Sequence, residues 1–268
     1  MKAVKKSIVC ILMSVSVMLF GAWTPNSEED QRYADALILS KYASETIVYT
    51  DKVFGEKNTT NSDAPKYKPI SGLTNSCGAV AGSIIVGFYD KYYSNLIENW
   101  DSYFPNGKYR GQDAVYVPAL MNELYKLMRT NIDDVGVSQS DFLSGLQKYI
   151  SGRGYAITYR SVATTSTLDY GTCKETIDSN NLIVIFSRPG DVYTIGINAG
   201  YDDVTAINIS DYHIMVAYGY QEINYYNANG LFRTDIYLNV MTGRPGVTNA
   251  LYKISPHNLQ AAYAVTLK

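Results

Sequence analysis

Cysteine and histidine are scarce in this chain, and their scarcity excludes several kinds of site. The sequence holds 3 cysteines and 2 histidines among 268 residues. A cysteine pair at zinc-ligand spacing and the HExxH motif are both lacking, so we expect no metal site. So few cysteines also exclude the dense disulfide framework of small secreted scaffolds. The glycine-rich loops that bind phosphate are lacking as well, and we expect no cofactor.

Basic clusters, proline and glycine are also limited. Lysine and arginine number 23 against 25 acidic residues, and they do not cluster beyond the first six residues. Nucleic-acid binding needs a concentrated basic face and is therefore not expected. The 8 prolines and 20 glycines are too few for a fibrous chain, and 46% hydrophobic residues are too many for a disordered one. Tyrosine is abundant at 25 residues, which suits β-strands and the rims of grooves.

The N-terminus has the three-part layout of a secretory signal. Lys2, Lys5 and Lys6 precede an uncharged apolar run that extends to Trp23. We predict a signal peptide over residues 1–22 and a protein that is secreted or held at the cell surface. An uncleaved membrane anchor is the alternative. Because a second apolar run of about 18 residues is lacking, no other membrane contact is expected.

The rest of the chain divides by composition into an arm and one domain. Residues 23–66 are polar and indicate an N-terminal arm or pro-region, with the composition of a linker from Gly55 to Tyr67. We assign residues 67–268 to a single domain.

Helical patterns dominate the first half of that domain. Pro118 fits the first turn of a helix. Ser138 and Asp141 fit a capping box at the start of another. A further short helix is predicted over residues 172–179. The expected apolar stripes are Leu120, Leu124, Leu127 and Met128 for the first helix and Phe142, Leu146, Tyr149 and Ile150 for the second.

From Leu182 onward the pattern changes to short β-rich runs separated by turn dipeptides. No helical pattern intervenes, so an antiparallel sheet or half-barrel is expected, and the fold class is α+β. The runs are LIVIF, VYTIGI, VTAINI, HIMVAYGY, DIYLNV, ALYKI and YAVTL. The turns between them include Pro189-Gly190, Asp202-Asp203 and Asn229-Gly230.

Cys77 opens an apolar segment that predicts a buried helix. Asn75 or Ser76 can cap this helix, which places the cysteine in its first turn. There the helix dipole favours a thiolate, and main-chain N–H groups remain free to stabilise an oxyanion. Gly78 would let a substrate backbone come close. The alternatives are a small buried apolar cysteine or a disulfide with Cys173.

His213 opens a predicted buried strand, whereas the other histidine, His257, follows Ser255-Pro256 in a predicted turn. An imidazole beside a thiol accepts its proton and later protonates the leaving amine. A Cys77–His213 pair would therefore make a nucleophilic site. A structural histidine satisfied by main-chain partners is the alternative.

These two motifs carry a resemblance to a known family. NSCGAVAG at the start of an apolar helix, followed by HIMVAYGY, resembles the papain-like cysteine peptidases. Within them the chain is most similar to the bacterial group related to the bacteriocin-leader processing peptidases. The resemblance implies a papain-like fold, in which an N-terminal helical half carries the nucleophile helix against a C-terminal antiparallel sheet or half-barrel.

The resemblance also implies a third catalytic residue and a side-chain oxyanion donor. An Asn or Asp after the histidine strand would orient the imidazole, and Asn239 is the best match. Val240, Asp235, Asn227 and Asp211 are competitors. The family's oxyanion glutamine, about six residues before the cysteine, corresponds here to Ser71. Asn75 could replace it or cap the helix.

The motifs and the resemblance together predict a cysteine peptidase that cleaves a peptide or protein substrate by acyl transfer. Two other functions stay open. One is a catalytically inactive module that binds a peptide or glycan on the same scaffold. The other is a cell-wall peptide hydrolase or transamidase. The oligomeric state is not predicted.

Overall fold

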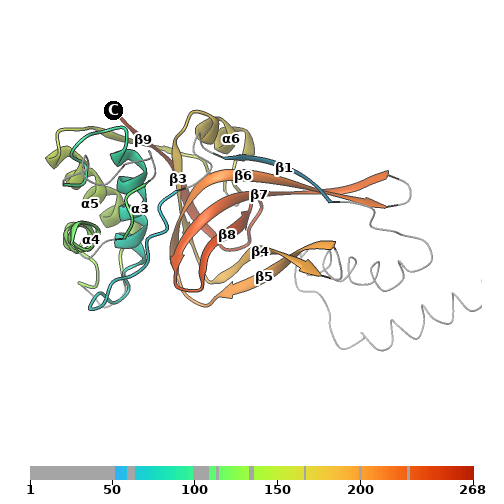
Figure 1. The fold of residues 1–268 in the computed structure, drawn as a ribbon, viewed down its shortest axis with the longest axis horizontal. Helices are drawn as coiled ribbons and strands as arrows, with labels where there is room; N and C mark the ends of the chain where they lie inside the picture. Colours follow the sequence, from blue (N-terminus) through green and yellow to red (C-terminus); the bar gives the residue numbers. More distant parts are fainter. Residues whose placement is uncertain are drawn as a thin grey trace, which may run out of the picture. The chain divides into compact units, whose positions relative to one another are not determined.

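The computed structural model describes residues 52–58, 64–98, 109–112, 115–132, 136–165, 167–198, 201–227 and 230–268. Within it, Lys52–Tyr225 and Arg233–Lys268 form one compact unit (Figure 1). The predicted signal peptide and most of the predicted arm lie outside the described residues.

The described elements confirm the α+β prediction. The helices are α3 (Cys77–Asp90), α4 (Tyr116–Leu127), α5 (Gln139–Gly152) and α6 (Tyr170–Asp178). The strands are β1 (Lys52–Asn58), β2 (Ile157–Ser161), β3 (Leu182–Ser187), β4 (Gly190–Asn198), β5 (Tyr201–Ile209), β6 (His213–Asn227), β7 (Gly230–Arg244), β8 (Val247–Lys253) and β9 (Leu259–Leu267).

The strands form one sheet in the order β2-β9-β3-β6-β7-β8-β4-β5, and the registered pairs are antiparallel. β1 also pairs with β6, along residues 219–225, beyond the stretch of β6 that pairs with β3. The predicted arm therefore contributes a strand to the sheet. The linker expected from Gly55 is wrong for residues 55–58, because pairing with β6 orders a polar segment that composition alone assigns to a loop.

Of two local predictions, a capped helix after Ser138 and a turn at Asp202-Asp203, the structure confirms the first and contradicts the second. The helix after Ser138 is confirmed, and the Ser138 hydroxyl accepts a hydrogen bond from the Asp141 main-chain N–H at 3.1 Å. The predicted turn at Asp202-Asp203 is wrong. Both residues lie within β5, where they pair with Ile197 and Gly196 of β4.

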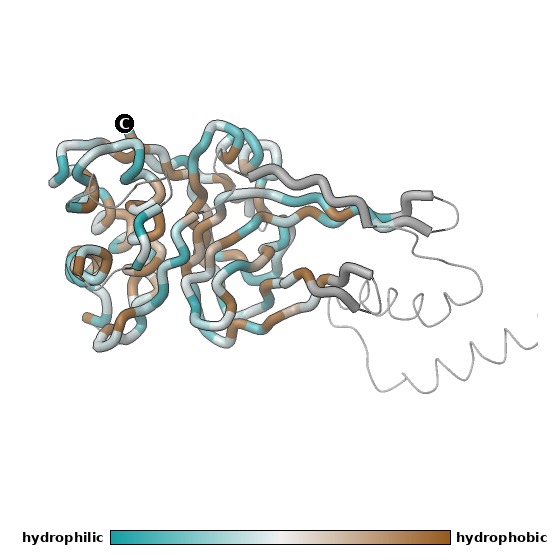
Figure 2. Tube along the Cα trace, viewed as in Figure 1, coloured by the Kyte–Doolittle hydropathy of each residue, from teal (hydrophilic) through white to brown (hydrophobic). Residues whose placement is uncertain are grey.

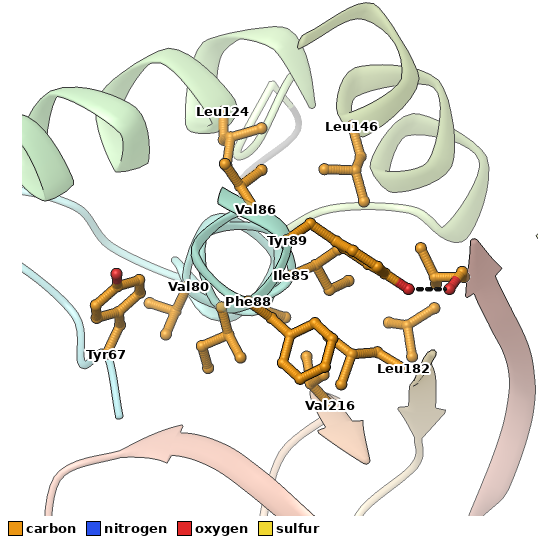
Figure 3. Close-up of a cluster of buried hydrophobic side chains, with 14 of the residues drawn as sticks. Tyr67, Val80, Ile85, Val86, Phe88, Tyr89, Leu124, Leu146, Leu182 and Val216 are labelled. Carbon is orange, nitrogen blue, oxygen red and sulfur yellow. Dashed lines mark hydrogen bonds between the residues drawn. The ribbon is translucent and has the colours of Figure 1, made fainter. Parts of the chain in front are cut away.

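Helix α3 is the centre of the core. Each of its residues from Gly78 to Asp90 is buried. Figure 3 views this helix nearly end-on: Leu124 of α4 and Leu146 of α5 approach it from one side, and Leu182 of β3 and Val216 of β6 from the other. The helix is enclosed so completely because small residues, Ala79, Ala81, Gly82, Ser83 and Gly87, let its neighbours come close.

The sheet has an apolar core on both faces. Along β3, Leu182, Val184 and Phe186 pack into the cluster around α3. The alternate residues Ile183 and Ile185 pack into a second cluster that includes α6 residues. The strand is therefore apolar from Leu182 to Phe186, in keeping with the hydropathy colours of Figure 2. The two faces of the sheet thus serve two separate cores.

Candidate active site

Cys77 is the first residue of α3, and its side chain is half-buried. The main-chain N–H groups of Ile214, Gly78 and Cys77 itself favour the thiolate form of its side chain. Burial raises the pKa of the thiol, while these N–H groups and the positive charge of Arg244 oppose the rise. The sequence predicts a thiol activated by the helix end, and here the structure differs, because burial outweighs the N–H groups.

No side chain caps the first turn of α3. Ser76 occupies the N-cap position without a side-chain hydrogen bond to the helix. The Asn75 side chain is also committed elsewhere, since its Nδ2 donates to Asn131 Oδ1 at 2.8 Å. Ser76 is therefore the N-cap residue, one of the two that the sequence predicted, but neither Ser76 nor Asn75 caps the helix with its side chain.

His213 is the first residue of β6, and it is buried. Its Nε2 lies 2.7 Å from the main-chain carbonyl oxygen of Thr242. A carbonyl only accepts hydrogen bonds, so Nε2 carries the proton in the neutral ring, and Nδ1 carries the lone pair. Burial, with a smaller contribution from the positive charge of Arg244, lowers the pKa of the imidazole to about 4, although the Thr242 carbonyl and the Asp211 carboxylate oppose the fall. At neutral pH the ring is therefore an uncharged base with a defined tautomer.

The Thr242 carbonyl reaches the ring because β7 is irregular at this point. The register with β8 shifts between Met241 and Arg244. Gly243 has φ +69°, a left-handed conformation that suits glycine, and a Cβ there would lie 2.7 Å from Val80 Cγ1 of α3. The segment therefore packs closely on the helix that carries Cys77.

The predicted third residue, Asn239, lies elsewhere on the same strand. It is buried and pairs with Leu251 of β8. The hydrogen bond described for the His213 ring goes instead to Thr242, three residues further along β7. The competitor Asp211 pairs with Arg244 at 3.3 Å, and Asp235 pairs with Arg233 at 3.4 Å.

The other predicted site residues have different surroundings from those expected. Ser71 is exposed in a turn. A Cβ on Gly78 would clash with Val137 Cγ1 and would lie 3.6 Å from Ile214 Cδ1. The space beside Gly78 is thus filled by protein, so this glycine is needed for packing rather than for the approach of a substrate.

Cys77 and Cys173 are both free, which excludes the disulfide alternative. Cys173 is buried in the second core cluster, where burial raises its pKa to about 12. Ile214 belongs to the core cluster against which Cys77 packs, and His213 is the residue before it. Among the contacts described for these residues, there is no hydrogen bond between the sulfur and the imidazole. Cys77 and His213 thus lie at the starts of α3 and β6, both in their uncharged forms.

Sequence reasoning did not single out Thr242 or Arg244. A main-chain carbonyl leaves no residue-type signal, although the TGRPG run at residues 242–246 has the composition of an irregular turn. Arg244 carries a charge, but its closeness to the site depends on the β7–β8 connection.

No family model matches the chain, and no curated protein matches it in sequence. In the part of the chain that the structure describes, no helix is both long and apolar enough to cross a membrane.

Proposed function

We propose that this protein is an exported, papain-like cysteine peptidase that hydrolyses peptide bonds with Cys77 as nucleophile and His213 as base. The observation that carries the proposal is the 2.7 Å contact of His213 Nε2 with a carbonyl, next to Ile214, which belongs to the core cluster against which Cys77 packs. That contact leaves Nδ1 as the basic nitrogen of the imidazole.

The reaction would proceed by acyl transfer. Nδ1 of His213 takes the thiol proton while the sulfur bonds to the substrate carbonyl carbon. The main-chain N–H groups of Cys77 and Gly78 stabilise the resulting oxyanion. The C–N bond then breaks, and the imidazolium gives its proton to the leaving amine. Water hydrolyses the thioester by the same path in reverse and regenerates the thiol.

Burial makes concerted proton transfer the natural course of the first step. A thiolate alone is disfavoured at this site, and so is an imidazolium alone. Transfer of the proton from sulfur to Nδ1 creates both charges together, and their attraction offsets the desolvation that each would suffer separately.

The proposal is tested with Cys77→Ala, and Cys173→Ala is the matched control. Purified full-length protein is incubated with casein, with a mixed peptide library and with purified cell-wall peptides. We expect Cys77→Ala to lose all cleavage, while Cys173→Ala keeps it. Urea unfolding of Cys77→Ala should match the wild type, because the half-buried thiol contributes little packing. Equal turnover by wild type and Cys77→Ala would refute the proposal.

An inactive binding module is the second candidate, and the raised pKa of the Cys77 thiol favours it. The two candidates differ in how Cys77 depends on His213. In a peptidase, His213→Ala slows alkylation of Cys77 by iodoacetamide at pH 6, because the base is lost. In a binding module the rate is low and does not change with this substitution.

A further inference from the structure

An ion pair flanks His213 and its Thr242 contact and has no part in the acyl-transfer steps. Arg244 Nη2 lies 3.3 Å from Asp211 Oδ2. Asp211 precedes His213 by two residues, and Arg244 follows Thr242 by two. The pair therefore brackets the contact that holds the imidazole. The Arg244 main-chain N–H also donates to the Thr242 hydroxyl at 3.0 Å, which fixes the start of the arginine side chain.

The two members of the pair differ in exposure. The Asp211 side chain is 72% exposed and the Arg244 side chain 33% exposed. Exposed ion pairs contribute little to folding because water and salt compete for both charges. The main chain of Arg244 is thus fixed within its own strand, while the carboxylate partner of its guanidinium is exposed and easily replaced.

The charge of Arg244 acts on both reacting groups. At Cys77 it opposes the rise in pKa that burial causes, and at His213 it adds to the fall that burial causes. Both effects are those of a positive charge near the sulfur and the ring. A guanidinium is also the side chain best suited to bind a carboxylate through two parallel hydrogen bonds.

We propose that Arg244 is a substrate-binding residue that recognises a carboxylate next to the scissile bond, and that Asp211 holds this position until a substrate replaces it. The inference rests on the proposed function for the identity of its substrate, which would be a peptide with an acidic side chain or a free C-terminus near the cleaved bond. The carboxylate site itself can be tested without any peptide cleavage.

The first test compares two alkylating reagents at Cys77. Iodoacetate carries a carboxylate, and iodoacetamide is its neutral analogue of nearly the same size. The rate ratio of the two reagents at Cys77 is followed by mass spectrometry in wild type, Arg244→Gln, Asp211→Asn and Arg160→Gln. Arg160 is the matched control, because it forms a similar exposed pair with Glu175 at 3.2 Å on another part of the surface.

We expect Arg244→Gln to lower the iodoacetate-to-iodoacetamide ratio by about tenfold, and Asp211→Asn to raise it by about threefold. Arg160→Gln should leave the ratio unchanged. A ratio that Arg244→Gln does not lower overturns the inference. Failure of both reagents to reach Cys77 overturns it too, because a carboxylate site beside the sulfur must be open to solvent.

The second test identifies the source of the carboxylate. Three peptides of one backbone sequence are compared: acidic side chains with an amidated end, neutral side chains with a free C-terminus, and neutral side chains with an amidated end. We expect kcat/KM for one of the first two to exceed that for the third by about tenfold in wild type, and the preference to vanish in Arg244→Gln. Equal cleavage of all three overturns the substrate assignment. If no peptide is cleaved while the reagent ratio responds to Arg244→Gln, the proposed peptidase fails and the carboxylate site stands.

Discussion

The ring of His213 is held by the main chain of Thr242, at 2.7 Å from its carbonyl oxygen. A main-chain acceptor does for the imidazole what a side-chain carboxamide or carboxylate does in a catalytic triad: it fixes the tautomer and the ring orientation. It carries no charge, so it stabilises an imidazolium less than a carboxylate would. The position of that carbonyl depends on the glycine that follows it.

Gly243→Ala should therefore impair catalysis more than a comparable change in the same turn. The added Cβ meets Val80 Cγ1 at 2.7 Å, in a left-handed conformation. We expect kcat/KM to fall at least about tenfold and the free energy of unfolding by about 2–3 kcal/mol. Gly246 is the control, since its φ is also positive at +83° and a Cβ added there would meet nothing within 4 Å. Gly246→Ala should lower the free energy of unfolding by only about 1–2 kcal/mol and leave kcat/KM unchanged. The interpretation fails if both variants lose activity equally.

The pH dependence of Cys77 reactivity should report the His213 base. Because the pKa of His213 is about 4, the neutral imidazole is present throughout the range from pH 5 to 8. We expect the iodoacetamide rate at Cys77 to fall as the pH drops through about 4, and not through the ordinary histidine value of about 6.5. The inflection should vanish in His213→Gln. An inflection near pH 6.5 in wild type would contradict the described burial of the ring.

Asp90 should make the fold less stable at alkaline pH. It ends α3, where its Oδ1 accepts the Ile97 N–H at 2.7 Å. Its Oδ2 is buried and has no hydrogen-bond partner among the described residues. Burial raises its pKa from 3.8 to about 7, so the folded state holds the proton more tightly than the unfolded state does. The contribution of Asp90 to the free energy of unfolding is therefore fully present below about pH 4 and is lost as the pH rises through about 7.

Asp90→Asn removes this dependence and keeps an acceptor for Ile97. The difference in free energy of unfolding between Asp90→Asn and wild type should favour the variant by about 1–3 kcal/mol more at pH 8 than at pH 5. Urea unfolding at the two pH values measures the difference, and an equal effect at both would show that Asp90 does not titrate in this range. Asp211→Asn serves as the control, because that carboxylate is exposed.

A pair of glycines on α5 tests the helix packing. A Cβ on Gly145 would lie 2.7 Å from the main-chain nitrogen of Met128, whereas one on Gly152 meets nothing within 4 Å. Gly145→Ala should destabilise the fold by about 2 kcal/mol or more, since main-chain atoms cannot move aside. Gly152→Ala should be neutral or stabilise it by up to about 1 kcal/mol. Thermal unfolding of both variants measures the contrast, and similar melting temperatures would refute the packing.

The features that the sequence predicts well are those set by neighbouring residues. The helix after Ser138 depends on a local cap and on a stripe of apolar residues, and both are present in the structure. The strand at His213 and the helix at Cys77 likewise follow from continuous apolar runs.

The features that the sequence does not predict depend on distant contacts. The Thr242 carbonyl acts through its main chain, and the left-handed Gly243 that presents it packs on Val80, far away in the sequence. The pKa of Cys77 is set by burial between α3 and β6 rather than by its place at a helix end. β1 has a polar composition and becomes a strand only because β6 offers an edge.

That edge bears on how the chain could be shortened. β1 covers positions 219–225 of β6. If proteolysis removed everything before residue 59, the main-chain N–H and C=O groups of β6 that pair with β1 would become exposed. An exposed strand edge of this kind can pair with another molecule and cause aggregation. Removal of the N-terminus as far as residue 58 would therefore lower solubility, even if it made the candidate active site more accessible. Maturation by complete loss of β1 is for this reason disfavoured.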